Sequence, residues 1–181
     1  MHRPVAITGT PGTGKSTVAR QIAGPLRVVE LSTLARTVGA AEGRGRNVQV
    51  DLRRLARIVE EERTLDAYDV IVGHLSHLLP VSEAIVLRCH PAELLRRLRR
   101  ARRGSAAERQ ENVVCEATDL VLAEALATGR PVYEVDTTGR TSASVVAVVR
   151  RRIRTGGPAR WGTVDWLGDP RVTAHLLDRP R

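Results

Sequence analysis

Short apolar runs recur along this chain, and most are followed by stretches in which the apolar residues have helical spacing. The runs are PVAIT at 4–8, RVVEL at 27–31, YDVIVGH at 68–74, AIVLRC at 84–89 and PVYEVDTT at 131–138. Continuous apolar runs of this length are typical of strands that are buried on both faces of a parallel sheet. The pattern therefore predicts five parallel strands.

The intervening segments predict helices. In 50–62, VDLRRLARIVEEE, the apolar residues Leu52, Leu55, Ile58 and Val59 fall on one face. Strands that alternate with helices form a parallel sheet that is covered by helices on both faces. The predicted fold class is therefore α/β, with a five-stranded parallel sheet flanked by helices. The other segments expected to be helical are 15–24, 32–39, 90–103, 107–129 and 142–153.

Two segments depart from this alternation. Segment 40–47, AAEGRGRN, is rich in Gly and Arg and is predicted to be a mobile loop. The C-terminal segment gains Gly, Pro and both tryptophans, Trp161 and Trp166. We expect one domain over 1–155 and a tail over 156–181 that packs its tryptophans on the domain or on a partner. The last residues of the tail are expected to fray.

Length and composition agree with one domain. The 181 residues are 42% hydrophobic and contain no Phe, so the core must be aliphatic. No apolar run approaches the roughly 20 residues that a membrane helix needs, and the opening MHRPVAIT lacks the layout of a signal peptide. We therefore expect a cytoplasmic protein without membrane association, with Cys89 and Cys115 as reduced thiols.

The chain carries a formal charge of +9, and nearly all of its basic residues are arginines. Lys15 is the only lysine in the sequence. A compact ammonium can follow a phosphate as it moves, which the planar guanidinium of arginine does less well. The remaining positive charge is compatible with nucleotides, RNA or an acidic partner, and net charge alone does not separate these.

Residues 9–16, GTPGTGKS, fit the phosphate-binding pattern G-x-x-x-x-G-K-[ST] between a predicted strand and a predicted helix. Glycines let the backbone approach a phosphate closely and point N–H groups toward it, beside a helix N-terminus. Lys15 would reach the β and γ phosphates, and the Ser16 hydroxyl would bind Mg²⁺. The expected ATP or GTP site consists of Gly9, Gly12, Thr13, Gly14, Lys15, Ser16 and Thr17.

The rest of the chain narrows the class of nucleotide-binding protein. GTPases carry an N-K-x-D-like segment that reads the guanine base, and the sequence contains none. The chain is also short for a GTPase or a motor. These features favour a small kinase that uses ATP and Mg²⁺.

Five segments in a fixed order carry a resemblance to a known family. They are GTPGTGKST from residue 9, VIVGHLSHLLP at 70–80, AIVLRCHPAELLRRL at 84–98, RRG…ENVVCEA at 102–117 and VYEVDTTGRT at 132–141. Through them the chain resembles the adenylate kinase isoenzyme 6 family, small nucleoside monophosphate kinases of archaea and of the eukaryotic nucleus. The resemblance implies a P-loop kinase that phosphorylates AMP and other monophosphates from Mg·ATP and hydrolyses ATP slowly. It also implies a role in maturation of the small ribosomal subunit, with a ribosomal protein and rRNA as partners.

The resemblance places the acceptor nucleotide on segment 29–53. This segment would close over the monophosphate, and the candidates to bind it are Arg36, Asp51 and the loop with Arg44 and Arg46. Because this chain uses arginine everywhere, an ordinary solvated role for these arginines stays open.

The resemblance also implies a lid and a catalytic histidine. Segment 102–112 would be the lid, with Arg103 over the ATP phosphates, where it excludes water and stabilises charge. His74 would lie near the transferring phosphate and place a water or stabilise charge, with a structural role as the alternative. Asp136 would lie near the adenine, or would instead cap its own turn. His77, three residues after His74, is expected to be structural.

One position departs from the family pattern. Relatives usually carry an acidic residue two positions before the histidine, where it holds a water on Mg²⁺, and this chain has Val72 there. Asp69 lies earlier, near the entry of the strand. Mg²⁺ would rest on Ser16, phosphates and water, or borrow the carboxylate of Asp51 or Glu30, and a weakened rate would follow. Two alternatives to the monophosphate kinase stay open: a ribosome-assembly ATPase with little kinase activity, and a small-metabolite kinase.

Overall fold

The computed structural model describes residues 3–43 and 48–177, and a five-stranded parallel sheet lies at its centre. The strands pair in the order β2-β5-β1-β6-β7. The prediction of an α/β fold on five parallel strands is confirmed. The strands are β1 (Val5–Thr8), β2 (Val28–Glu30), β5 (Val70–Val72), β6 (Glu83–Arg88) and β7 (Val132–Asp136).

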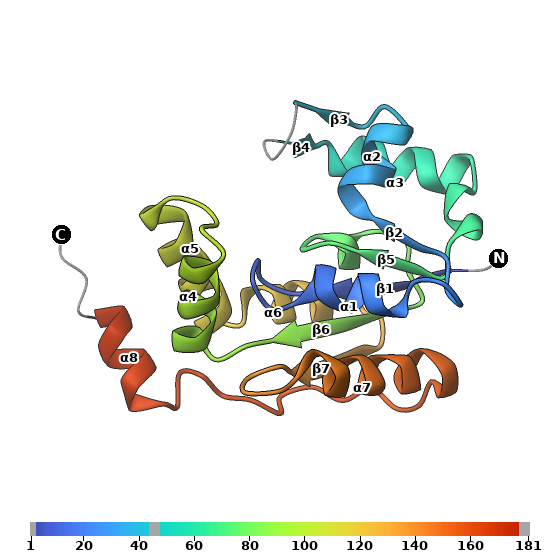
Figure 1. The fold of residues 1–181 in the computed structure, drawn as a ribbon. Helices are drawn as coiled ribbons and strands as arrows, with labels where there is room; N and C mark the ends of the chain where they lie inside the picture. The colour runs from blue at the N-terminus through green and yellow to red at the C-terminus, as the bar shows by residue number, and fades with distance from the viewer. Residues whose placement is uncertain (1–2, 44–47, 178–181) are drawn as a thin grey trace.

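Helices cover both faces of the sheet (Figure 1). One face packs against α1 (Lys15–Ile22) and α7 (Ser142–Thr155), which also contact each other. The other face packs against α2 (Leu31–Thr37), α3 (Leu52–Glu61) and α6 (Leu120–Ala127).

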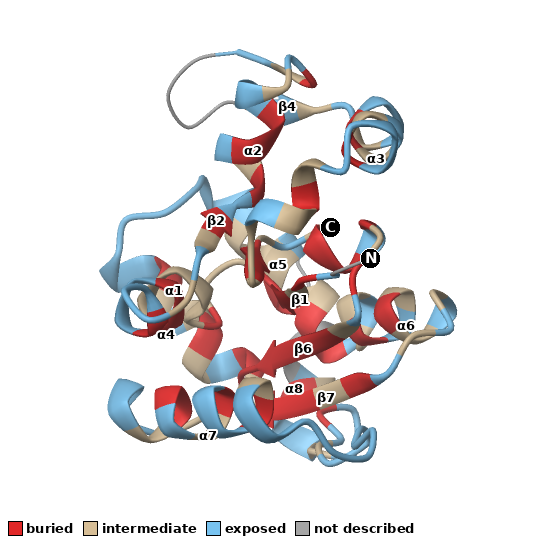
Figure 2. Cartoon of the chain, turned by 90° about the vertical axis from the view of Figure 1, so that its right-hand side faces the viewer, coloured by how far each residue is buried: buried red, intermediate tan, exposed pale blue. Residues whose placement is uncertain are grey.

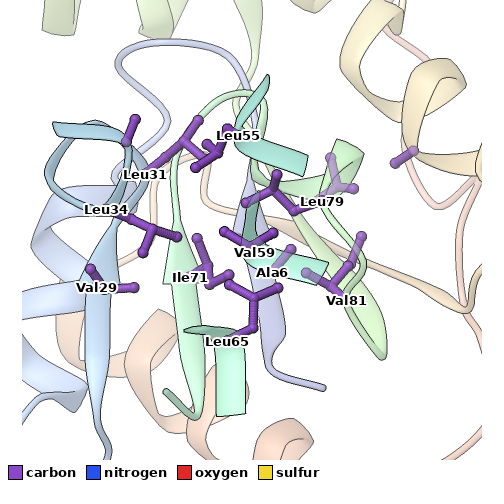
Figure 3. Packing of buried hydrophobic residues seen from close by; sticks show 14 of the residues in the cluster. Ala6, Val29, Leu31, Leu34, Leu55, Val59, Leu65, Ile71, Leu79 and Val81 are labelled. Carbon is purple, nitrogen blue, oxygen red and sulfur yellow. The ribbon is translucent and has the colours of Figure 1, made fainter. Parts of the chain in front are cut away.

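Strand alternation divides the core into two layers, because successive side chains point to opposite faces. Ile7 and Ile85 pack with α1 and α7. Ala6 and Ile71 face the opposite layer, where Figure 3 shows them among leucines and valines that include Leu34 from α2. Figure 2 shows the outcome: buried residues line β6 and β7, and α7 exposes its outer side. The core is aliphatic, as the absence of Phe requires.

Between β2 and β5 the chain forms an arm that consists of α2, a hairpin and α3. The hairpin strands are β3 (Ala41–Glu42) and β4 (Gln49–Val50), paired antiparallel. Segment 40–47 was expected to be only a loop, and that expectation is wrong for its first residues. Pairing with β4 satisfies backbone groups there that a loop would leave to water. Arg44 and Arg46 lie outside the described residues.

The segment 107–129, expected as one helix, is two helices. α5 (Ala106–Ala117) packs against α4 (Pro91–Arg100), whereas α6 packs on the sheet. The break lies at Asp119, whose φ of 56° is left-handed and whose carboxylate pairs with Arg88. Two different packing partners therefore override a continuous helical sequence pattern.

The tail returns to the sheet and ends on a helix. Arg160 bridges to Tyr133 of β7, through bonds from Arg160 N to Val132 O (2.9 Å) and from Glu134 N to Arg160 O (2.7 Å). Helix α8 (Pro170–Leu177) follows. Trp166 is buried, with 9% of its surface exposed, whereas Trp161 is 56% exposed. Only Trp166 of the two tryptophans packs into the domain.

Within residues 3–43 and 48–177, no helix is both long enough and apolar enough to cross a membrane. Cys89 and Cys115 are both free thiols, as expected. Burial raises the pKa of the Cys89 thiol to about 12, so it stays protonated at neutral pH.

Candidate nucleotide-binding site

The turn between β1 and α1 has the backbone geometry of a phosphate loop. Gly9 and Gly12 adopt φ of 135° and 99°, in the left-handed half of the map. A Cβ at Gly9 would lie 2.3 Å from the Leu87 carbonyl oxygen, and one at Gly12 would lie 2.8 Å from Leu94 Cδ1. Only glycine fits this close approach of the loop to β6 and α4.

Lys15 folds over this loop. Its ammonium donates to the Gly9 carbonyl at 2.6 Å and to the Thr10 carbonyl at 2.9 Å. Burial lowers the pKa of Lys15 to about 7; Glu116 and Glu30 counter this effect, and the charge of Arg103 adds to it. A phosphate bound in the loop would favour the charged ammonium and raise this pKa again.

A cavity of about 410 Å³ opens beside the loop. Its walls come from the phosphate loop, the ends of β2 and β5, the arm, and the last turn of α4. The cavity therefore joins the phosphate loop to the arm that was expected to hold an acceptor. Its lining includes Gly12, Gly14, Lys15, Ser16, Thr17, Glu30, Val50, Val72, His74, Arg97 and Arg103.

The two histidines after β5 have different surroundings. His74 lines the cavity, and its pKa is lowered by desolvation and then by the charge of Lys15. It is therefore neutral at pH 7 and can accept a proton or orient a water. His77 is fully buried, as a structural histidine would be.

Thr8 and Glu124 lie on the two sides of the His77 ring. The Thr8 hydroxyl donates to the His74 carbonyl at 2.9 Å and lies 2.9 Å from His77 Nδ1. On the other side, His77 Nε2 lies 3.5 Å from the Glu124 carboxylate and makes no hydrogen bond among the described residues. Burial, with the nearby His74, lowers the pKa of His77 to about 4.

Arg103, the residue expected to lie over the ATP phosphates, lines the cavity. Its backbone N–H bonds to the Leu98 carbonyl at 3.1 Å, which closes the end of α4, and Ser105 then caps α5. Arg99 and Arg100 are exposed and lie outside the cavity lining. Arg103 therefore reaches the cavity, whereas the nearby Arg99 and Arg100 do not.

A buried carboxylate behind the loop was not singled out from the sequence. Glu116 of α5 accepts hydrogen bonds from the Thr10 hydroxyl (2.6 Å), Arg88 Nε (2.8 Å), Cys89 N (2.9 Å) and Trp166 Nε1 (3.2 Å). Arg88 is itself 2% exposed and also pairs with Glu134 at 2.6 Å. The only signal for Glu116 was its place in the ENVVCEA segment.

Arg97 is a second residue that sequence reasoning missed. It lines the cavity, and its guanidinium donates to the Thr137 carbonyl at 2.8 Å and to Glu93 at 3.0 Å. These bonds hold it on the wall between α4 and the end of β7. Arg97 lies on a helix with many arginines, so the sequence gave no reason to single it out.

Five expected site residues lie outside this cavity lining. Gly9 and Thr13 belong to the phosphate loop itself, and the other three lie elsewhere. The Asp136 carboxylate accepts from Thr138 N at 2.8 Å, and it lines a separate cavity of about 280 Å³. Asp51 caps α3 through a 2.9 Å bond from Arg54 N, and it lines a third cavity of about 300 Å³ beside the hairpin. Arg36 is exposed on α2. The structure does not bring these three residues to the phosphate loop.

The residues around the loop fit a bound Mg²⁺. This ion usually takes one or two carboxylates together with substrate phosphates and water. The Ser16 hydroxyl and the Glu30 carboxylate belong to residues on the same cavity wall. Asp69 instead binds Arg27 at 2.8 Å near the start of β5. No group of three His, Cys, Asp or Glu within the described chain could hold a metal without the nucleotide.

Comparisons with known proteins agree with this geometry. Residues 5–119 match a family described as an AAA domain. A Pyrococcus furiosus protein named "putative adenylate kinase" is 43% identical over 166 residues, 90% of each chain. A Thermococcus onnurineus protein of the same name is 38% identical over 177 residues, 96% of this chain and 97% of that one. A solved Janibacter sugar kinase, 15% identical, superposes with a TM-score of 0.51 over 86% of this chain and 96% of that one, which shows the fold alone.

Proposed function

This chain belongs to the family of the archaeal adenylate-kinase-like proteins, and we propose that it transfers the terminal phosphate of ATP to a nucleoside monophosphate. AMP is the proposed acceptor, with other monophosphates also accepted, so that ATP and AMP give two ADP. The cofactors are ATP and Mg²⁺.

The observation that carries this proposal is the shared cavity. Lys15 and Ser16 of the phosphate loop line it together with Val50 of the arm. A donor phosphate on the loop and an acceptor on the arm would therefore meet in one cavity. An ATPase that only switches conformation needs no second nucleotide site there.

The side chains around the cavity divide the work of phosphoryl transfer, which is mostly positioning and charge neutralisation. Lys15 follows the transferred phosphate, and Arg103 covers the donor phosphates and excludes water. Neutral His74 orients the attacking phosphate group or a water. Mg²⁺, when bound, neutralises charge on the phosphates.

Slow ATP hydrolysis and a role in small ribosomal subunit maturation form a second proposal. The sequence resemblance supports it, and so does the basic surface of α4. Arg99 and Arg100 are exposed there, beside a net charge of +9, and suit the phosphates of rRNA. A water placed by His74 in the absence of acceptor would account for the hydrolysis.

A coupled assay tests the proposed function. ADP formation from ATP plus AMP should be much faster than phosphate release from ATP alone. Equal slow rates that ribosomal subunits accelerate would contradict the kinase and favour the assembly ATPase. Transfer to a small metabolite but to none of the four nucleoside monophosphates would also contradict it. Competition between monophosphates then ranks the acceptors.

A further inference from the structure

The phosphate loop lacks its usual acidic neighbour on β5, but an acidic residue stands beside that position. Val72 is the last residue of β5, and its register partner on β2 is Glu30. Partner residues of a parallel ladder direct their side chains to the same face of the sheet. Val72 packs in the cluster that contains Val18 and Ala19 of α1. Glu30 therefore stands on the face from which α1 begins.

Glu30 also lines the 410 Å³ cavity beside the phosphate loop, together with Ser16 and Thr17. Its negative charge raises the pKa of Lys15 and so opposes the effect of burial. The carboxylate is thus close enough to the phosphate loop to matter electrostatically.

Among the described residues, the Glu30 carboxylate has no other partner. The residue occupies the N-cap position of α2, yet its side chain makes no capping bond. In the part of the chain that the structure describes, no hydrogen bond or ion pair to this carboxylate is found. The neighbouring candidates are occupied, because Asp51 caps α3, Asp69 binds Arg27, and Glu116 accepts four hydrogen bonds.

We propose that Glu30 replaces the missing β5 carboxylate and holds Mg²⁺ at the nucleotide, together with the Ser16 hydroxyl. The metal-binding carboxylate would thus come from β2 instead of the adjacent strand β5, at the position paired with Val72. The proposal rests on the proposed function, since the ion comes with the nucleotide. It gives this chain a metal-positioning residue that its β5 sequence, VIVGH, lacks.

The test measures metal binding rather than turnover. Mn²⁺ substitutes for Mg²⁺ and is titrated into the protein–ADP complex, with free Mn²⁺ measured by electron paramagnetic resonance. Glu30→Gln should weaken Mn²⁺ binding to this complex by about tenfold or more, while calorimetry shows unchanged binding of metal-free ADP. The matched control is Glu61→Gln, at an exposed carboxylate at the end of α3 outside the cavity lining.

The outcomes separate the two proposals. If the wild-type protein fails to bind ADP or ATP at all, the proposed function is wrong. If it binds ADP, and Glu30→Gln binds Mn²⁺ within twofold of wild type, the assignment of Glu30 is wrong and the kinase stands. A second variant, Glu30→Gln with Val72→Asp, should recover Mn²⁺ binding, because it restores a carboxylate one strand over.

Discussion

The Thr10 hydroxyl of the phosphate loop donates a 2.6 Å hydrogen bond to the Glu116 carboxylate of α5. The same carboxylate binds Arg88 and Cys89 N of the β6 segment and Trp166 of the tail. One side chain thus connects the phosphate loop, the sheet, helix α5 and the C-terminal tail. Movement of any of these parts must either keep this carboxylate satisfied or break its bonds.

Glu116→Ala is expected to be strongly destabilising. It removes the carboxylate from Arg88, which is 2% exposed, and leaves part of a buried guanidinium unpaired. Loss of one partner of a buried ion pair costs about 3–5 kcal/mol, and we expect the lower end because Glu134 still pairs with Arg88. Urea unfolding measures this loss of unfolding free energy. Glu111→Ala, at an exposed site on the same helix, should change stability by less than about 0.5 kcal/mol.

The fluorescence of Trp166 in the tail should change when ATP binds to the phosphate loop. Trp161→Phe leaves Trp166 as the only tryptophan, and its emission should be blue-shifted because the ring is buried beside His90, with 5.2 Å between ring centroids. ATP should change this emission through the Glu116 contact. The converse variant, Trp166→Phe, should emit like exposed indole and stay unchanged with ATP. Equal responses from the two variants would contradict a coupled tail.

The sequence pattern was sufficient for the sheet and the phosphate loop. Buried parallel strands leave continuous apolar runs, and the loop needs glycines, a lysine and a serine in fixed order. Both signals are local, so a single stretch such as 9–16 is enough to predict the phosphate loop. His77 was expected to be structural from its place three residues beyond His74, and it is fully buried.

The features that sequence reasoning missed are relations between distant segments. The bond between Thr10 and Glu116 joins residues 106 positions apart. Glu30 and Val72 become neighbours only through strand register. At the helix break, Asp119 pairs with Arg88, 31 positions away. In a chain this rich in arginine, composition could not show which arginines are buried, lie on the cavity wall or are exposed.

His77 should make the fold sensitive to acid. Its pKa is about 4 in the folded protein and 6.5 when unfolded, so between these values the unfolded chain binds more protons. Stability is therefore full above pH 6.5 and falls as the pH drops toward 4, by at most about 3 kcal/mol. His77→Asn, which can keep the bond to Thr8, should flatten this slope. Urea unfolding at pH 7.5 and pH 5 measures the difference, and equal slopes would contradict the assignment.

Lys15 should not be replaceable by arginine. The ammonium fits between carbonyl oxygens at 2.6 and 2.9 Å, a space suited to a compact charge. Lys15→Met and Lys15→Arg should both lower the kinase rate by at least about 10²-fold. Circular dichroism should show an intact fold for each. A Lys15→Arg rate near that of wild type would mean that charge alone, without the ammonium shape, suffices.

Arg103 should differ from the arginines around it. Arg103→Ala is expected to lower kcat by about 10²-fold, because this side chain lines the cavity in which we propose that the ATP phosphates bind. KM for AMP should change little, since the proposed acceptor site is on the arm. Arg99→Ala is the matched control, four residues earlier on the exposed face of α4, and should leave kcat within twofold. If the two variants lose activity equally, α4 acts through its overall charge, and the lid role of Arg103 is wrong.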